Sequence, residues 1–498
     1  MYQSIQQFIE KDINEIEKIV GEVLTGEKDA DHLSQEILDR TTRLASRIIG
    51  ELYEKVDEEV VDSVQRKIGW NVEKRNEPKE ILDVVGMVRF NRTGFVDKKT
   101  GEYIYLLDRI LGLESHQRLT MGAAAKVLEE TLLTSYAKGG RAASPYDAVS
   151  KQTVKRIVHD TVIEFPTEKR KKNKEKKQLK TLYIIADEAH VAAQFWNEKG
   201  DLAIDSRGNT INTLMPKLIC VYEDIINESG EKSKKPRYRL VGKEYFCGIY
   251  KGEADNLKLW EQVRDYIEET YDTEVLEKVY IAGDGAAWIK VGLEVIEGSK
   301  FVLDKYHMMK YINESVSHLS EDNRELIKDD IWESINEADK EGLKEAYQSI
   351  LKVTESETKC EAIKGALKYL VNQWDGIRIR VLEAEGNWKC CAEGQVSHVL
   401  SARMSSRPMG WSEHGCDQMS RLLAYHWNGG KVIDLLRYQK EKQQKEKERQ
   451  EQEELIKELR KRQSGWEYAE QMQGVIPGLE RQNMRWMRNI ISQAVSGL

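Results

Sequence analysis

The sequence lacks several features that mark common protein classes. Its six cysteines are scattered over 498 residues and form no CxxC pair, which disfavours both a zinc ribbon and a disulfide framework and fits a reducing compartment. No apolar run approaches the ~20 residues that cross a bilayer. The first 20 residues contain acids and no uninterrupted apolar stretch, unlike a signal peptide. We therefore expect a soluble cytoplasmic protein with no membrane partner.

Two catalytic signatures are missing as well. The segment LYIIADEAHV (182–191) ends as the Walker B strand of a helicase does, but no GxxxxGK[ST] phosphate loop occurs anywhere. An ATP-driven helicase is therefore disfavoured. The motif HExxH is absent, and the spacing of the histidines and cysteines matches no common zinc site. Acidic residues are left as the main candidates for chemistry.

Charge is close to balanced over the whole chain but not along it. The 85 acidic residues outnumber the 77 Lys and Arg, for a net charge of −8. A protein that merely coats DNA would be basic, so this average counts mildly against nucleic acid. Residues 138–180, in contrast, carry 13 Lys and Arg against 5 Asp and Glu, a local net charge of +8. If the protein binds DNA, this segment is the first candidate.

The N-terminal third of the chain is expected to be helical and then to change character. Apolar residues at three- and four-residue spacing predict a helical region over 1–83. From 84 to 166 we predict a DNA-binding region that begins with a β-hairpin, with its turn at KKTG (98–101). A basic linker over 167–180 follows, either as a flexible tether or as a phosphate contact.

Two helices are predicted between the hairpin and the linker. The first is expected to end at Gly139 and Gly140, and the second to begin at Lys151 with Ser150 as its cap. Together they resemble a helix-turn-helix, for which ordinary helical packing is the alternative. The side chains expected to contact DNA from the second helix are Lys151, Gln152, Lys155 and Arg156.

Residues 181–430 have the pattern of an α/β domain. Three early strands, LYIIAD, PKLICVYED and YRLVGKEYFCGIY, precede a helix, the strand KVYIAGD, a second helix and the strand SKFVLDKYH. This order predicts a mixed sheet of the ribonuclease H type, interrupted by a helical insertion at about 311–385. Residues 431–498 are expected to form a solvent-exposed charged helix and a C-terminal tail.

Three acids occupy distinctive settings in this domain. Asp187 and Asp284 each end an apolar run, and Glu393 opens an amphipathic stretch, AEGQVSHVL. Acids at the ends of neighbouring strands can face each other, and carboxylates are the ligands that Mg²⁺ prefers. Two divalent ions about 4 Å apart ready the attacking oxygen and stabilise the leaving oxygen in phosphoryl transfer. The sequence therefore predicts a site for Mg²⁺, with Mn²⁺ as a substitute.

Basic residues near these acids are candidates for contact with DNA. His307 and Lys310 follow Asp304 in LDKYHMMK, where a capping Asp304 with a packed His307 is the alternative. Arg403 and Arg407 suit a DNA backbone, whereas Trp411 is expected to pack rather than to stack on a base.

Taken together, these blocks resemble those of the ISLre-type insertion-sequence transposases, a DDE group related to the Mutator-like transposases. The resemblance extends over almost the whole chain, through TGEYIYLLDRILGL (100–113), ADEAHV, GDGAAWIK, LDKYHMMK and SHVLSARMSSRPMGWSEHG. It implies a ribonuclease H-like core in which Asp187, Asp284 and Glu393 form the catalytic triad. Glu188, Glu383 and Glu385 lie nearby and are alternatives to members of the triad.

The family resemblance implies a transposase that cuts element ends and joins 3′-hydroxyls to target DNA. Its partners would be terminal inverted repeats and target DNA, held by a homo-oligomer because two ends must be brought together. Two other classes stay open: a sequence-specific DNA-binding regulator, and a metal-dependent nuclease without joining activity.

Overall fold

The computed structural model of the chain divides into two compact units. The first comprises Met1–Asp160 and Val432–Leu498, and the second comprises Thr161–Lys431. The structure describes residues 2–163, 175–195, 198, 200–204, 208–229, 237–383, 392–406 and 409–462. Within those ranges, every helix is either too short or too polar to traverse a lipid bilayer.

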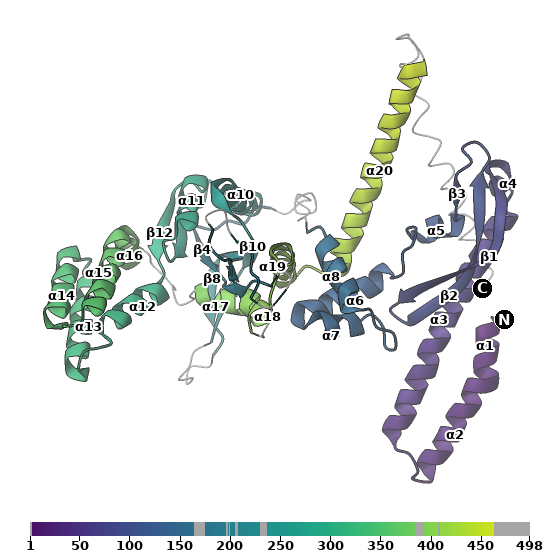
Figure 1. Cartoon of the computed structure of the whole chain (residues 1–498), viewed down its shortest axis with the longest axis horizontal. Helices are drawn as coiled ribbons and strands as arrows, with labels where there is room; N and C mark the ends of the chain where they lie inside the picture. The colour runs from purple at the N-terminus through teal and green to yellow at the C-terminus, as the bar shows by residue number, and fades with distance from the viewer. Residues whose placement is uncertain are drawn as a thin grey trace. The chain divides into compact units, whose positions relative to one another are not determined.

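The first unit combines a helical hairpin, a small sheet and a group of short helices (Figure 1). Its elements are α1 Gln3–Gln7, the π-helix η1 Phe8–Asp12, α2 Ile13–Leu24, α3 Ala30–Asp62, α4 Val64–Gly69, β1 Trp70–Asp83, β2 Gly86–Asp97, β3 Tyr103–Ile104, α5 Leu106–Leu111, α6 Met121–Leu133, α7 Tyr136–Arg141, α8 Lys151–Asp160 and α20 Val432–Arg462. Helix α20 packs against α6, so a segment near the C-terminus belongs to the same unit as the N-terminal helices.

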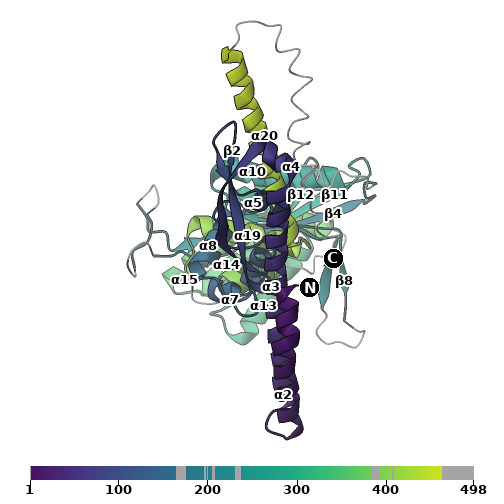
Figure 2. The same cartoon turned by 90° about the vertical axis from the view of Figure 1, so that its right-hand side faces the viewer.

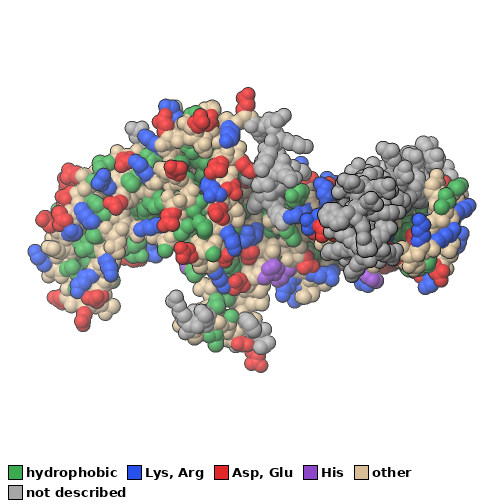
Figure 3. Space-filling view, turned by 90° about the horizontal axis from the view of Figure 1, so that it is seen from above, with side chains coloured by type: hydrophobic (Ala, Val, Ile, Leu, Met, Phe, Trp, Pro, Cys, Tyr) green, Lys and Arg blue, Asp and Glu red, His purple; other side chains and the backbone are tan. Residues whose placement is uncertain are grey.

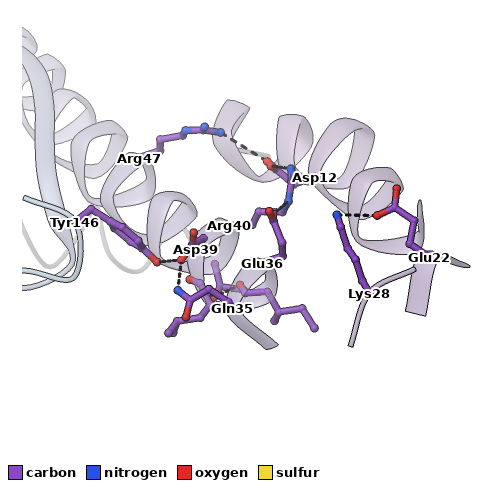
Figure 4. A network of polar contacts seen from close by, with 12 residues as sticks. Asp12, Glu22, Lys28, Gln35, Glu36, Asp39, Arg40, Arg47 and Tyr146 are labelled. Atoms are coloured by element: carbon purple, nitrogen blue, oxygen red, sulfur yellow. Dashed lines mark hydrogen bonds and ion pairs between the residues drawn. The ribbon is translucent and has the colours of Figure 1, made fainter. Parts of the chain in front are cut away.

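Helix α3 folds back beside α2, and Figure 2 shows this hairpin as a long rod with the α2–α3 loop at its tip. Polar contacts tie the rod together (Figure 4). Arg40 donates to Asp12 at 2.9 Å and to Glu36 at 3.1 Å, and the hydroxyl of Tyr146 donates to Asp39. These contacts connect α3 to the last residue of η1 and to the loop that precedes α8.

The prediction that residues 1–83 are helical is wrong for their last part. Residues 70–83 form β1, a long strand that pairs antiparallel with β2 along its length. The middle of β1 is charged and exposed, so its sequence offers no apolar alternation, and backbone pairing with β2 determines its conformation. The turn at KKTG is present between β2 and β3, but β3 has only two residues because buried Leu106 and Leu107 begin α5.

The two predicted helices that follow the hairpin differ in one respect from expectation. Ser150 does cap α8, since its Oγ accepts from the Thr153 N–H at 3.1 Å. Gly139 and Gly140, however, do not end a helix. They lie buried inside α7, where an added Cβ would collide with Thr131 or with the Val149 carbonyl, so they allow close helix packing.

The second unit is built on a mixed five-stranded sheet. Its elements are β4 Thr181–Glu188, β5 Val191–Ala192, β6 Thr213–Leu214, β7 Lys217–Tyr222, β8 Asp224–Asn227, β9 Tyr238–Val241, β10 Glu244–Gly248, α10 Gly252–Thr270, β11 Lys278–Gly283, α11 Ala287–Val295, β12 Ser299–Leu303, α12 Lys305–Val316, α13 Glu321–Asn336, α14 Lys340–Val353, α15 Glu357–Asn372, α16 Trp374–Leu382, α17 Ala392–Val396, the π-helix η2 Ser397–Ser401, α18 Ala402–Met404 and α19 Glu413–Trp427.

The order of the strands in this sheet is β10-β7-β4-β11-β12. Strand β7 runs antiparallel to β4 and to β10, whereas β11 runs parallel to both β4 and β12. The expected mixed α/β sheet is therefore confirmed. One predicted strand, YRLVGKEYFCGIY (238–250), is instead two, because Gly242 adopts a φ of 59° and turns the chain between β9 and β10.

A hydrophobic core covers one face of the sheet and continues into the helices that follow β12. Leu182, Ile184 and Ile281 of the strands pack with Trp260 of α10 in this core. The same core includes residues of α13 to α16, which lie together beside the sheet (Figure 1). The residues predicted as an insertion are thus helical and share the core of the sheet.

Candidate active site at the ends of three parallel strands

The alternation of side chains along the strands determines where the predicted aspartates lie. Tyr183 of β4, Tyr280 of β11 and Lys300 of β12 are register partners in three adjacent parallel strands. The rings of Tyr183 and Tyr280 stack 6.2 Å apart on the sheet face opposite the Leu182 and Ile281 core. Successive side chains of a strand alternate between faces, so residues four positions later return to the same face.

Asp187, Asp284 and Asp304 each stand four positions beyond this paired row. By this alternation all three lie at the carboxyl ends of β4, β11 and β12, on the same side of the sheet. Adjacent strands are about 4.8 Å apart, which is close to the ~4 Å that separates paired catalytic metal ions. The structure thus brings Asp187 and Asp284 together and adds Asp304 as a third acid.

Asp187 is the most deeply buried of the predicted catalytic acids, with 7% of its surface exposed. Its Oδ1 accepts from the N–H of Glu188 at 2.8 Å, while its Oδ2 is buried and has no hydrogen-bond partner. Burial is the main reason that the pKa of Asp187 is raised to about 7, and the nearby carboxylates of Asp284 and Glu393 make smaller contributions in the same direction. An unpartnered carboxylate oxygen among other acids is a position that a cation would stabilise.

The turn after β11 presents Asp284 and is held by the helical insertion. The Oδ1 atom of Asp284 accepts a hydrogen bond from the N–H of Ala286 at 2.8 Å. The Asp284 carbonyl oxygen accepts one from the hydroxyl of Tyr369 in α15 at 2.6 Å. Gly285 adopts a φ of 87°, and an added Cβ would lie 2.5 Å from the side chain of Gln373. A glycine is needed here both for the left-handed backbone and for the close approach of Gln373, the residue that follows α15.

Glu393 lies in the first turn of α17, which packs against β4. Its side chain is exposed, and its charge contributes to the raised pKa of Asp187. The alternative Glu383 forms an ion pair with Lys300 near the opposite end of β12, away from the aspartates. Glu385 lies outside the described residues. Glu188, the other alternative, is half-buried, and burial and Asp284 raise its pKa.

His307 of α12 joins the cluster of acids. Its Nδ1 lies 3.3 Å from Oδ2 of Asp304, and this contact raises the pKa of His307, with further contributions from Asp187 and Asp284. The Asp304 side chain makes no capping bond to α12. The interpretation of Asp304 as a helix cap is therefore wrong. The side chain of Lys310 is exposed, as a contact with phosphate requires.

Of the two arginines that are expected to contact DNA, the structure describes only Arg403. Arg403 is buried, and its guanidinium lies 5.1 Å from the ring of Trp411. Trp411 is buried as well and donates to the Met404 carbonyl at 3.0 Å, so the expectation that it packs is confirmed. The burial of Arg403 leaves little of its surface for a phosphate. Arg407 lies outside the described residues.

The predicted DNA-contacting face of α8 is open to solvent. Val154 and Val158 are its buried side chains, and Lys151, Gln152 and Arg156 are exposed, with Lys155 half-exposed. Helix α8 packs on α6 and α7, which makes a three-helix group in the first unit. Most of the basic linker, residues 167–174, lies outside the described residues.

Within the described parts of the chain, no three Asp, Glu, His or Cys side chains are close enough to hold an ion as they stand. The donor set nevertheless has the chemistry that Mg²⁺ requires, because it consists of carboxylates with one buried oxygen unpartnered. Sequence reasoning missed Asp304 as a member, although the same signal marked it: SKFVLD is an apolar run that ends in an acid.

Comparison with known proteins gives a family and a set of relatives. The sequence pattern of a family described as "Uncharacterised protein family (UPF0236)" matches residues 28–445. A UPF0236 protein of Caldanaerobacter subterraneus subsp. tengcongensis is 35% identical over 448 residues, which cover 90% of this chain and 89% of that protein. A second UPF0236 protein of the same organism is 35% identical over 448 residues, which cover 90% of this chain and 88% of that protein. Its name joins eleven locus designations.

Among solved structures, the Drosophila P element transposase strand transfer complex aligns with 67% of this chain and 83% of that chain. The sequence identity is 11% and the TM-score is 0.21. A score this low does not establish a shared fold.

Proposed function

This chain belongs to the uncharacterised protein family UPF0236, and we propose that it is a DDE transposase of the ISLre type. The observation that carries the proposal is the placement of Asp187 and Asp284 at the ends of neighbouring parallel strands, on one face of the sheet. The unpartnered Oδ2 of Asp187 supports the proposal. A buried carboxylate that lies near other carboxylates is destabilising in its charged form unless a cation binds beside it.

The topology supports a ribonuclease H-like assignment of the sheet. Three antiparallel strands, β10, β7 and β4, come first in the chain, and two strands parallel to β4 follow after helices. The helical insertion then separates β12 from α17, which presents Glu393. In this proposal the insertion has a structural role at the site, since Tyr369 of α15 and Gln373, the residue after α15, contact the Asp284 turn.

The proposed reaction exchanges one phosphodiester for another. The oxygen of a 3′-hydroxyl bonds to a target phosphorus and loses its proton, while the bond from that phosphorus to the displaced 3′-oxygen breaks and this oxygen gains a proton. No nucleotide is consumed. Asp187, Asp284 and Glu393 would hold Mg²⁺, or Mn²⁺ in its place, which supplies Lewis-acid stabilisation of the phosphoryl oxygens. His307 and Lys310 would contact phosphate beside them.

DNA recognition is assigned to the first unit. The exposed face of α8, with Lys151, Gln152 and Arg156, would contact the terminal inverted repeats. The helical insertion is a weaker candidate for DNA, because Figure 3 shows acidic and basic side chains intermixed over it, at the left of the view. A homo-oligomer on DNA would hold two element ends at once.

The multiplicity of the relatives gives independent support. A relative whose name joins eleven loci is encoded many times in one genome. Repeated loci of one gene are expected when the gene product moves or copies its own DNA, and they are not expected of an ordinary regulator or repair nuclease.

A strand-transfer assay tests the proposal. The full chain is incubated with labelled duplexes taken from the DNA that flanks its gene, with a supercoiled target plasmid and Mg²⁺. Joined products are expected with the wild type, and Asp187→Asn or Asp284→Asn should reduce them by about a hundredfold or more, because each removes charge where the metal is held. Asp329→Asn, which changes an exposed acid of α13, is the matched control.

The alternatives give different products. Cleavage of the flanking duplex without joining would show a metal-dependent nuclease, and sequence-specific binding without cleavage would show a regulator. Full joining by Asp284→Asn would refute the assignment of the metal site.

A further inference from the structure

The first unit contains a cleft that the proposed catalytic chemistry does not use. It has a volume of about 1130 Å³, and its walls come from β1, β2, β3, α5, the loop at 114–118 and Lys447 of α20. Ligand cavities typically measure ~300–1,000 Å³, so this one is large enough for a small organic group. Much of the wall belongs to the block TGEYIYLLDRILGL (100–113), which has no part in the proposed catalytic chemistry.

The floor of the cleft is a buried cluster of charges. Asp108, which is 6% exposed, forms ion pairs with Arg92 and with Lys79, whose Nζ lies 3.7 Å away. The guanidinium of Arg92 also lies 3.4 Å from the centre of the Tyr105 ring. Burial lowers the pKa of Lys79 while Asp108 opposes this change. Two cations therefore surround one carboxylate, which makes the floor a poor place for a metal ion.

Two polar atoms in this cluster are left without partners. Oδ1 of Asp108 and Nε of Arg92 are both buried and make no hydrogen bond. A buried polar atom without a partner costs free energy, and such atoms are rare in native proteins. One of the two accepts and the other donates, so a group that presents a donor beside an acceptor would satisfy both. The edges of nucleobases present this pair of functions.

An aromatic ring stands beside the charged floor. Tyr103 lines the cleft and is 41% exposed. Its hydroxyl donates to Glu77 at 2.8 Å, and so does the hydroxyl of Tyr105, at 2.5 Å, which fixes both rings. Gly94 of β2 lies beneath Tyr103, where any Cβ would collide with the tyrosine hydroxyl. A fixed, exposed aromatic face is suited to stacking on a base.

The mouth of the cleft carries cations that suit flanking phosphates. Arg118 is exposed and forms no ion pair with another residue in the described ranges. Arg109 is 53% exposed and lies 3.8 Å from Glu102, a weak pair at a solvated surface. A base attached to a DNA backbone would thus find phosphate contacts where its neighbours leave the cleft.

We propose that this cleft captures one unstacked nucleobase of the element-end DNA. The base would stack on Tyr103 and place its hydrogen-bonding edge against Asp108 Oδ1 and Arg92 Nε. This inference rests on the proposed function, because it takes the element end as the substrate. The first unit would then recognise DNA in two ways. Helix α8 contacts the duplex, and the cleft binds a base at the end of the element that has left the base stack.

A missing-base scan tests the inference. Duplexes from the DNA that flanks the gene are made with a single abasic position at each place in turn, and their binding to the full chain is measured by fluorescence anisotropy. The wild type should lose about tenfold in affinity at one or two adjacent positions, as expected for one lost stacking contact. Tyr103→Ala should bind the intact duplex about tenfold more weakly and lose nothing more at those positions.

Two variants serve as controls. Tyr103→Phe keeps the ring and should keep the wild-type profile, which separates stacking from misfolding. Lys18→Ala removes an exposed cation of α2 that does not line the cleft, and its profile should also match the wild type. Thermal melting of each variant verifies that it is folded.

The outcomes are distinct. A flat abasic profile for the wild type, or the same profile in Tyr103→Ala, overturns the inference. So does binding of free deoxynucleoside monophosphates that depends on Tyr103 while the abasic profile stays flat. The joining assay on the same duplexes separates the two proposals: joining with a flat profile overturns only the role of the cleft, whereas the absence of both binding and joining overturns the proposed function as well.

Discussion

Each unit of the molecule buries an aspartate that keeps one carboxylate oxygen without a partner. Asp108 in the first unit is 6% exposed, and Asp187 in the second is 7% exposed. The neighbours of the two residues differ in sign. Arg92 and Lys79 surround Asp108, whereas Asp284 and Glu393 add negative charge around Asp187 and help to raise its pKa to about 7.

This contrast indicates what each site can bind. A carboxylate already neutralised by two cations has no need of a further positive charge, and its free oxygen is suited to a neutral donor. A carboxylate among carboxylates is stable in its charged form only with a cation beside it. The same side chain at the same burial thus points to a base edge in one unit and to a divalent metal ion in the other.

The largest effect on stability is expected at Asp108. The change Asp108→Ala should lower the free energy of unfolding by about 3–5 kcal/mol, because it leaves Arg92 and Lys79 buried without their partner. Urea denaturation of the full chain measures this, with Glu59→Ala, an exposed acid of α3, as the control. A loss below about 1 kcal/mol would mean that the two cations do not depend on Asp108, and the comparison would fail.

The opposite sign is expected at Asp187. Its folded-state pKa of about 7 lies above the ordinary value of 3.8, so folding favours its protonated form. The resulting penalty is absent below pH ~4, grows as the pH rises toward 7 and is complete above it. Without metal, Asp187→Asn should therefore be more stable than the wild type at pH 8 by about 1–4 kcal/mol, and the two should converge near pH 4.

Denaturation at several pH values in the presence of a chelator measures this difference, and Asp329→Asn is the control. If Asp187→Asn were less stable than the wild type at pH 8, the charged carboxylate of Asp187 would stabilise the fold rather than destabilise it. In that case the two aspartates would be alike.

A smaller effect separates the turn at Asp284 from an ordinary glycine turn. Gly285 and Gly298 both have positive φ, 87° and 72°, but only Gly285 is crowded, by Gln373, whereas nothing lies within 4 Å of a Cβ at Gly298. Gly298→Ala should cost about 1 kcal/mol from backbone strain alone. Gly285→Ala should cost about 1–3 kcal/mol more because it also overpacks against α15. Equal losses in thermal melts would show that α15 does not hold the turn.

The smallest effect is expected on the exposed face of α8, away from either buried acid. Lys151→Ala and Arg156→Ala should each weaken DNA binding at every sequence and reduce the slope of log affinity against log salt by about one. Lys18→Ala, in α2, is a control for charge. A change in sequence preference without a change in slope would mean that these residues contact bases rather than phosphates.

Part of the candidate site could be predicted from the sequence because the relevant signal is local. Asp187 and Asp284 each follow an apolar run, and such a run indicates both a buried strand and the position of its end. Asp304 follows a run of the same kind, but the adjacent His307 suggested a different role for it. The mixed sheet could also be predicted, since several early strands are followed by a helix, a strand, a second helix and a last strand along residues 181–303.

The cleft in the first unit could not be predicted, because the residues that line it come together only when β1 pairs with β2. The charged middle of β1 has no apolar period, so the position of Lys79 opposite Phe90 of β2 depends on long-range register. Arg403 failed as a predicted DNA contact for a similar reason. Its burial against Trp411 depends on how the chain folds back after α18, which the residues around it do not indicate.

The central claim is that Asp187 and Asp284 together hold a divalent ion. Titration of the full chain with Mn²⁺ at pH 8, with free Mn²⁺ followed by electron paramagnetic resonance, tests it without any DNA. The wild type and Asp329→Asn should bind Mn²⁺ alike, and Asp187→Asn and Asp284→Asn should each bind it at least about tenfold more weakly. Unchanged Mn²⁺ binding in both variants would contradict the account.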